Sequence, residues 1–161
     1  MRSMKALVLG GTGAMGIHLV QLLADAGIDT VVTSRKQRRS AGTVKYVQGN
    51  AHNMQFLRRI LQTHWDVIID FMVYDTASFQ QRAPLFCRAT SQYIFLSSAR
   101  VYADSTQPIT EASPRLLDVS PDKKYLSTDE YALAKARQED ILMRSGCTNW
   151  TIIRPYITYS E

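Results

Sequence analysis

Cysteine, proline and long apolar runs are all scarce in this chain, and each scarcity excludes a class of protein. There are two cysteines and five prolines in 161 residues. Cys87 and Cys147 are isolated in the sequence, so we expect neither a structural disulfide nor a zinc site. We therefore expect the protein in a reducing, cytoplasmic compartment. No apolar run approaches the roughly 20 residues that a membrane-spanning helix needs, so no membrane partner is expected. The histidines share no metal-ligand spacing, which predicts no metal site: His18, His52 and His64.

The overall composition is that of one soluble globular domain covering residues 1–161. Hydrophobic residues make up 45% of the chain and charged residues 20%, which argues against disorder. The length is enough for a sizeable core. A formal net charge of +5 suits an anionic small molecule, but it is too mild to indicate nucleic acid as a partner.

The glycines gather at one turn near the N-terminus, and the flanks of that turn predict a binding function. Residues 6–9 are continuously apolar, as in a buried parallel strand, and a helical pattern starts at Ala14. Between them lies Gly10-x-x-Gly13-x-x-Gly16, a variant of the dinucleotide fingerprint, in which a helix N-terminus offers N–H groups to phosphate. An ordinary glycine-rich turn is the weaker alternative, and a P-loop is excluded because no Gly-Lys-Ser/Thr follows. The expected cofactor contacts here are Gly10, Thr12, Gly13, Ala14, Met15 and Gly16.

A basic cluster, residues 35–39, directly follows the second predicted strand. Arg35 lies about twenty residues after the last motif glycine, where dinucleotide folds place the residue that distinguishes the two nicotinamide cofactors. An acidic residue there binds the ribose 2′-hydroxyl, whereas arginine accommodates a 2′-phosphate, so NADP is favoured over NAD. A basic surface loop without a ligand is the alternative, and the absence of interleaved aromatic residues disfavours nucleic acid.

Apolar strands alternate with helical patterns along the rest of the chain. This alternation predicts an α/β fold, a doubly wound, Rossmann-like parallel sheet with helices on both faces. Asn53 is expected to cap one helix, Pro84 to kink or break another, and residues 104–129 to form a long polar connection. The predicted strands are 6–9, 30–34, 44–47, 65–71, 93–96 and 149–154, and the predicted helices are 14–26, 55–62, 76–88 and 128 or 129 to 145.

Three polar side chains are candidates for proton chemistry. Tyr131 and Lys135 are four residues apart on a predicted helix, which places them on one face, one turn apart. A nearby ammonium group favours phenolate, so it lowers the pKa of a tyrosine from about 10 towards the range useful for proton transfer. Ser98, at the end of a predicted strand, could donate a hydrogen bond to a carbonyl oxygen that gains negative charge.

Together these motifs resemble the short-chain dehydrogenase/reductase superfamily, in particular its extended branch of NAD(P)-dependent epimerases and dehydratases. They occur in the family's order over nearly the whole chain. The matching segments are Gly10-x-x-Gly13-x-x-Gly16, Ser97 to Tyr102 (SSARVY), Pro108 to Pro114 (PITEASP), Tyr131-x-x-x-Lys135 with Glu139, and Arg154-Pro155 followed by Tyr159.

The resemblance implies a role for each catalytic candidate and a reaction class. Tyr131 would be the acid/base, Lys135 would bind the nicotinamide ribose and tune Tyr131, and Ser98 would hold the substrate oxygen. Pro155 would complete the cofactor site. The implied reaction is hydride transfer at a hydroxyl or carbonyl carbon, with nucleotide-activated sugars the commonest substrates of the branch. A non-catalytic NADP-binding sensor or regulatory protein is the alternative.

The sequence also departs from the family pattern. Asn50 stands where the family usually has an Asp that contacts adenine, and residues 70–73 replace a turn of small residues. Extended members continue with a seventh strand and a substrate-binding region, whereas this sequence stops at Glu161. We therefore expect a truncated cofactor-binding part whose substrate region is missing. The apolar residues 141–143 are expected to pack in the hydrophobic core or, as in the family, to form a homodimer interface between paired helices.

Overall fold

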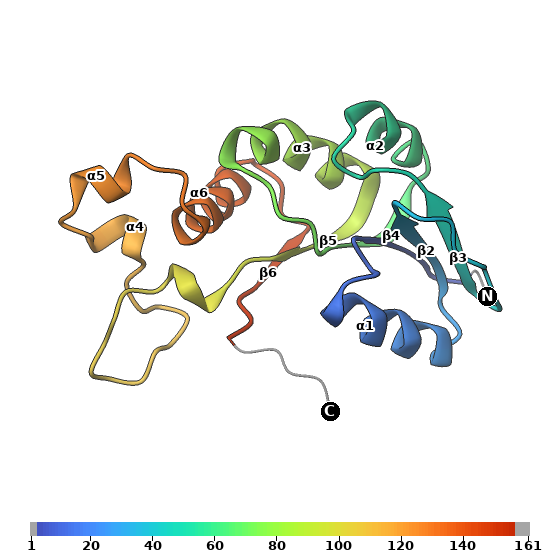
Figure 1. Ribbon diagram of the computed structural model, residues 1–161, viewed down its shortest axis with the longest axis horizontal. Helices are drawn as coiled ribbons and strands as arrows, with labels where there is room; N and C mark the ends of the chain where they lie inside the picture. The colour runs from blue at the N-terminus through green and yellow to red at the C-terminus, as the bar shows by residue number, and fades with distance from the viewer. Residues whose placement is uncertain (1–2, 157–161) are drawn as a thin grey trace.

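The computed structural model describes residues 3–156 and arranges them around a six-stranded sheet (Figure 1). All strand pairs are parallel, and the strand order is β3-β2-β1-β4-β5-β6. The chain thus runs outward from β1 in one direction and then in the other, which confirms the predicted doubly wound sheet. The strands are β1 (Lys5–Leu9), β2 (Asp29–Ser34), β3 (Val44–Gln48), β4 (Trp65–Asp70), β5 (Thr90–Leu96) and β6 (Trp150–Ile153).

Helices cover both faces of the sheet, as predicted. Figure 1 shows α1 on one side and α2 and α3 on the other, with α6 beside α3. In residues 3–156, no helix has both the length and the apolar character needed to cross a bilayer. The helices are α1 (Ala14–Asp25), α2 (Met54–Ile60), α3 (Thr76–Ala89), the single 3₁₀ turn η1 (Ala99–Val101), α4 (Leu116–Val119), α5 (Lys123–Leu126) and α6 (Tyr131–Met143).

The two faces of the sheet form two apolar clusters. Because successive side chains of a strand point to opposite faces, the unbroken apolar run of β1 supplies both clusters. Leu7 and Leu9 pack in a large aromatic-rich cluster that includes Phe79 of α3 and Leu142 of α6. Ala6 and Val8 pack in a smaller cluster with Val20 of α1. Since Leu142 is fully buried, the stripe 141–143 contributes to the core.

Local capping follows the sequence where a single residue decides it. The chain leaves α1 through Gly27, whose φ of +70° is the left-handed conformation that glycine adopts without strain. At the start of α2, the Asn53 side chain accepts hydrogen bonds from the backbone N–H groups of Gln55 and Phe56, at 2.9 and 3.0 Å. This confirms the predicted cap.

Three local predictions were wrong or incomplete. Helix α3 continues through Pro84, so the break that was one of the two predicted outcomes does not occur, and buried Phe79 and Phe86 on either side dock the helix on the sheet. Helix α6 begins at Tyr131 and not at 128 or 129, since the Glu130 carboxylate caps it by accepting the Ala132 N–H at 2.8 Å. The connection 104–129 is not wholly irregular, because it contains α4 and α5.

The two cysteines meet although they are isolated in the sequence. Cys87 lies near the end of α3 and Cys147 just before β6, and both are free thiols. Burial, together with the hydrogen bond to Cys147, raises the pKa of the Cys87 thiol to about 12. Cys87 therefore packs at neutral pH as a neutral, weakly polar side chain.

Candidate cofactor and catalytic site

The glycine turn between β1 and α1 is closely packed backbone. Gly10 has a φ of +71°, and its N–H donates to the Thr33 hydroxyl at the end of β2, at 3.2 Å. A Cβ on Gly16 would lie 2.5 Å from the Gly11 Cα, so only glycine lets α1 start this close to the strand. Gly11 is equally constrained, since a Cβ there would lie 2.7 Å from the Val8 side chain, although the motif spacing does not single it out.

This turn opens into a pocket of about 500 Å³ at the carboxyl ends of the strands. Five of the predicted cofactor residues line it: Gly10, Thr12, Gly13, Arg35 and Asn50. The other turn residues, Ala14, Met15 and Gly16, lie in the first turn of α1 and do not line this pocket, and neither do Lys135 and Pro155. His52 and Met72 line the pocket and were missed, because no spacing rule connects them to the glycine turn.

The residues present fit a dinucleotide. The N-cap of α1, Gly13, makes no side-chain capping hydrogen bond, so first-turn N–H groups are left for an anion. A Cβ on Gly13 would lie 3.7 Å from the Gly10 carbonyl oxygen, an ordinary contact distance, so packing within the protein does not require glycine here. Arg35 follows β2 and lies beside the pocket as an exposed cation.

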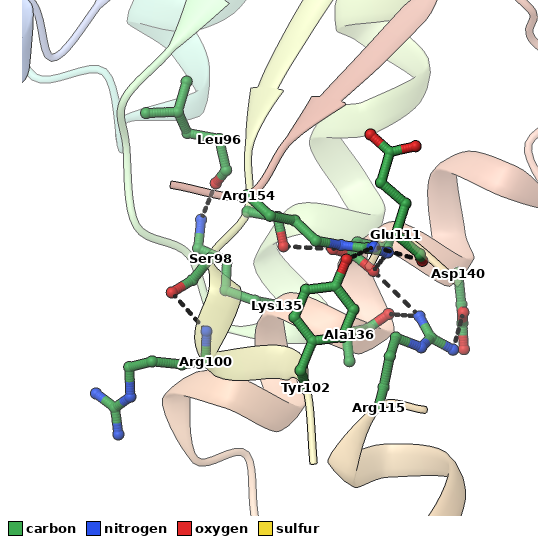
Figure 2. Close-up of polar contacts among 12 residues, drawn as sticks. Leu96, Ser98, Arg100, Tyr102, Glu111, Arg115, Lys135, Ala136, Asp140 and Arg154 are labelled. Atoms are coloured by element: carbon green, nitrogen blue, oxygen red, sulfur yellow. Dashed lines mark hydrogen bonds and ion pairs between the residues drawn. The ribbon is translucent and has the colours of Figure 1, made fainter. Parts of the chain in front are cut away.

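Tyr131 and Lys135 come together at the first turn of α6, as their spacing predicts. The Lys135 Nζ lies 6.0 Å from the centre of the Tyr131 ring and donates a 2.7 Å hydrogen bond to the Leu96 carbonyl (Figure 2). Lys135 is almost fully buried, and this burial lowers its pKa to about 8, although Asp70 and Glu139 oppose the shift. Lys135 is therefore mostly charged at neutral pH and can lose its proton in a mildly basic solution.

Ser98 lies two residues beyond the carbonyl that Lys135 binds. It is buried, and its hydroxyl accepts the Arg100 N–H at 3.2 Å. The Arg100 guanidinium in turn lies 5.3 Å from the centre of the Tyr131 ring. The structure thus groups Ser98, Tyr131 and Lys135 where β5 ends and α6 begins. It adds Arg100, a cation that the sequence pattern did not indicate. No hydrogen bond joins Ser98 to Tyr131 within residues 3–156.

A buried carboxyl group, Asp70, lies between the glycine turn and Lys135. Asp70 is paired with Leu9 in the sheet, and its oxygens accept hydrogen bonds from the Met72 N–H at 2.9 Å and the Tyr93 hydroxyl at 2.8 Å. Burial raises the pKa of Asp70 to about 6, against these hydrogen bonds and the charge of Lys135. An acidic residue at the end of an apolar strand was the only sequence signal for this group.

A second buried carboxylate, Glu139, ties together the elements around the catalytic candidates. The Arg154 Nε and Nη2 each donate to it at 2.8 Å, and the Arg115 Nη1 donates at 3.2 Å. The Ser97 hydroxyl donates a fourth hydrogen bond. Burial alone would raise the pKa of Glu139, but the bonds from Arg154 and Ser97 outweigh it and hold that pKa below its usual value.

The arginines extend this cluster to the long connection. Arg154 also donates to the Tyr102 hydroxyl and Arg115 donates to Asp140 at 2.8 Å (Figure 2). Because Glu139 lies one turn beyond Lys135 on α6, the cluster fixes that helix against the ends of β5 and β6. Next to it an open hollow of about 1140 Å³ runs along β6, beside Glu111 and Tyr102 and well away from the glycine turn.

The fold has close counterparts among solved structures, at low sequence identity. The Bordetella bronchiseptica enzyme WbmH, solved with NAD+, superposes with a TM-score of 0.74 at 16% identity, over 95% of this chain and 56% of that one. MoeE5, solved with UDP-glucuronic acid and NAD, gives 0.69 at 18%, over 92% and 52%. A short-chain dehydrogenase/reductase superfamily protein from Agrobacterium tumefaciens with bound NAD gives 0.72 at 19%, over 93% and 48%. The chain thus spans about half the length of these structures.

Sequence comparison gives the family directly. No curated protein matches the chain in sequence. Residues 10–161 match the model of a family described as NAD(P)H-binding, and this range begins at the first glycine of the turn. The chain belongs to the NAD(P)H-binding family, and its fold is that of the extended short-chain dehydrogenases/reductases.

Proposed function

We propose that this chain is the cofactor-binding part of an NADP-preferring short-chain reductase, epimerase or dehydratase. Its substrate would carry a hydroxyl or carbonyl carbon, and a nucleotide-activated sugar is the favoured class. The observation that carries the proposal is the placement of the Tyr131–Lys135 pair at the same sheet edge as the glycine-turn pocket.

The preference for NADP rests on Arg35. It lines the pocket immediately after β2, where dinucleotide folds recognise the adenosine ribose. Among residues 3–156 it has no ion-pair partner, and a 2′-phosphate would supply one. The nucleotide-sugar class is supported by the UDP-glucuronic acid that is bound in MoeE5.

The chain's own residues can then perform the proton chemistry. The nicotinamide, when bound, supplies or accepts the hydride. Tyr131 would move the proton of the substrate hydroxyl. Ser98 would donate a hydrogen bond to the substrate oxygen, and Lys135 is held for its role by the Leu96 carbonyl. Pro155 stays close to this group, since its carbonyl accepts the Ala99 N–H at 3.0 Å.

A titration with NADPH and with NADH, followed by nucleotide fluorescence, tests the cofactor proposal. Binding with NADPH preferred is expected, and Arg35→Gln should remove that preference while leaving NADH binding unchanged. Equal affinity for both nucleotides in the unmodified chain would refute the role of Arg35. Binding of neither would refute the cofactor proposal for this chain.

A second experiment separates an enzyme from a non-catalytic sensor. Tyr131→Phe keeps the ring but removes the hydroxyl, so it should leave NADPH binding intact and abolish turnover in a version that carries the substrate region. An active Tyr131→Phe variant would show that another group moves the proton. No turnover of nucleotide sugars, sugars or simple ketones by the unmodified protein would favour the sensor.

A further inference from the structure

Two buried groups of opposite charge at the carboxyl edge of the sheet lack an ion-pair contact within residues 3–156. Asp70 and Lys135 are 1% and 3% exposed, and neither takes part in a salt bridge there. Buried Glu139 differs, because Arg154 and Arg115 both contact its carboxylate. An isolated charge in a protein interior is strongly destabilised, so Asp70 and Lys135 each require something that offsets their burial.

The sheet places Asp70 and Lys135 on the same face. Asp70, at the end of β4, pairs with Phe95 of β5, and residues paired across parallel strands point to the same side of a sheet. The Lys135 Nζ reaches this side from α6 and lies 4.6 Å from the centre of the Phe95 ring. The ammonium thus lies over the immediate neighbour of Asp70 in the sheet.

The hydrogen bonds of Asp70 all come from uncharged donors within residues 3–156. Its carboxyl accepts the Met72 N–H at 2.9 Å, the Tyr93 hydroxyl at 2.8 Å and the Tyr74 hydroxyl at 3.4 Å. Burial raises the pKa of Asp70 to about 6, against these hydrogen bonds and the charge of Lys135. At neutral pH the carboxyl is therefore mostly ionised, and the cation that faces it is Lys135.

The ammonium of Lys135 is offset by charge and by one carbonyl. Its hydrogen bond goes to the Leu96 carbonyl at 2.7 Å (Figure 2), and the centre of the Tyr131 ring lies 6.0 Å away. Burial lowers the pKa of Lys135 to about 8, and the opposing charges are Asp70 first and Glu139 second. Because Glu139 is already paired with two arginines, Asp70 is the main counter-charge of this lysine.

We infer that Asp70 is a positioning residue of the proposed site, because its carboxylate is the buried counter-charge that keeps Lys135 an ammonium. An ammonium group has three N–H donors, and the Leu96 carbonyl takes one, so two are left for the hydroxyls of the nicotinamide ribose. The neutral amine has one donor fewer and forms weaker hydrogen bonds. The role at the ribose rests on the proposed function, whereas the coupling of the two charges does not.

Carbon-13 NMR of labelled lysine and aspartate side chains tests the coupling in the chain alone. Lys135 should lose its proton with a midpoint near pH 8, and its signal should be absent from Lys135→Met. Asp70→Asn keeps an oxygen for the Met72 N–H but carries no charge, so it should lower this midpoint by about 1, a tenfold weaker hold on the proton. Lys135→Met should raise the midpoint of the Asp70 carboxyl equally, because coupling between two sites is reciprocal.

Asp66→Asn is the matched control. Asp66 lies near the opposite end of β4, where its carboxylate accepts the Lys5 N–H at 2.7 Å, so its replacement should leave the Lys135 midpoint unchanged. The affinity for NADPH, followed by nucleotide fluorescence against pH, is the functional readout. In Asp70→Asn it should begin to fall about one pH unit lower than in the unmodified chain, whereas a structural defect would weaken binding at every pH.

An unchanged Lys135 midpoint in Asp70→Asn would overturn the inference and leave the proposed function standing. An unchanged Asp70 midpoint in Lys135→Met would do the same, and this variant tests the coupling even if Asp70→Asn fails to fold. Coupled midpoints without binding of NADPH at any pH would overturn the proposed function, and with it the role of Asp70 at the ribose.

Discussion

The two ends of the sheet's functional edge are built in different ways. Around β1–β3 the site is shaped by backbone, with glycines at Gly10, Gly11 and Gly16 where a side chain would clash or strain. Around β5 and β6 it is held by charge. Every ion pair in residues 3–156 joins residues from 100 to 154, and none lies in the segment 3–99.

The two regions differ in how far apart in the sequence the interacting residues lie. The tightest approaches in the glycine turn, of Gly11 to Val8 and of Gly16 to Gly11, are between residues a few positions apart, so the sequence spacing identifies the turn. Glu139, by contrast, gathers donors from Ser97, Arg115 and Arg154, which come from three other parts of the chain. Steric constraints of the first kind resist salt and pH, whereas the charged cluster depends on ionisation.

The largest effect is expected at the centre of the charged cluster. Glu139→Gln removes a fully buried carboxylate and leaves Arg154, whose side chain is only 20% exposed, without its carboxylate partner, while Arg115 keeps Asp118 and Asp140. We expect a loss of about 3 kcal/mol in the free energy of unfolding, measured with urea. The matched control is Asp118→Asn, whose carboxylate is half exposed and should contribute less than about 1 kcal/mol. Equal losses in the two variants would contradict the importance of burial.

The glycine turn can be tested with two alanines. Gly16→Ala places a Cβ against the Gly11 backbone, so it should cost about 2–3 kcal/mol of stability. Gly13→Ala meets no protein atom closer than 3.7 Å, so it should unfold like the unmodified chain but bind NADPH more weakly. Urea unfolding and a nucleotide titration distinguish these effects. A stable Gly16→Ala variant would mean that the turn has room to spare.

Asp70, which lies between the two regions, predicts that the stability of the protein depends on pH. Its folded pKa of about 6 lies above the ordinary value of 3.8, so the protonated form stabilises the fold at low pH and this contribution is lost as pH rises through 6. Asparagine does not ionise. The stability of the unmodified chain relative to Asp70→Asn should therefore fall by about 3 kcal/mol between pH 3.5 and 7.5. Urea titrations at several pH values measure this, and a flat difference would refute it.

The smallest effect is expected at the exposed edge of the charged region. Arg100 pairs with Glu130 at 3.2 Å, but the Arg100 side chain is 68% exposed. Arg100→Gln should change the free energy of unfolding by no more than about 0.5 kcal/mol, and less at high salt. Thermal unfolding in low and high salt checks this. A larger loss would mean that the stacking of Arg100 on Tyr131 supports the fold.

Sequence alone determined the features whose causes are local or periodic. The apolar runs gave the strands, the glycine spacing gave the turn, and four-residue spacing placed Lys135 beside Tyr131 because a helix turns once in that distance. Asn53 capped its helix as expected, for the same reason of short range.

Tertiary structure alone decided what depends on which strand ends become neighbours. Asp70, His52 and Arg100 joined the site through the sheet order and the packing of α3 and α6, which no spacing encodes. Pro84 remained helical because the aromatic side chains around it outweigh its local preference. Glu139, visible in the sequence only as part of a family pattern, became the centre of the charged cluster because burial and three distant donors converge on it. Local sterics can be deduced from neighbouring residues, whereas burial and charge pairing exist only once the chain has folded.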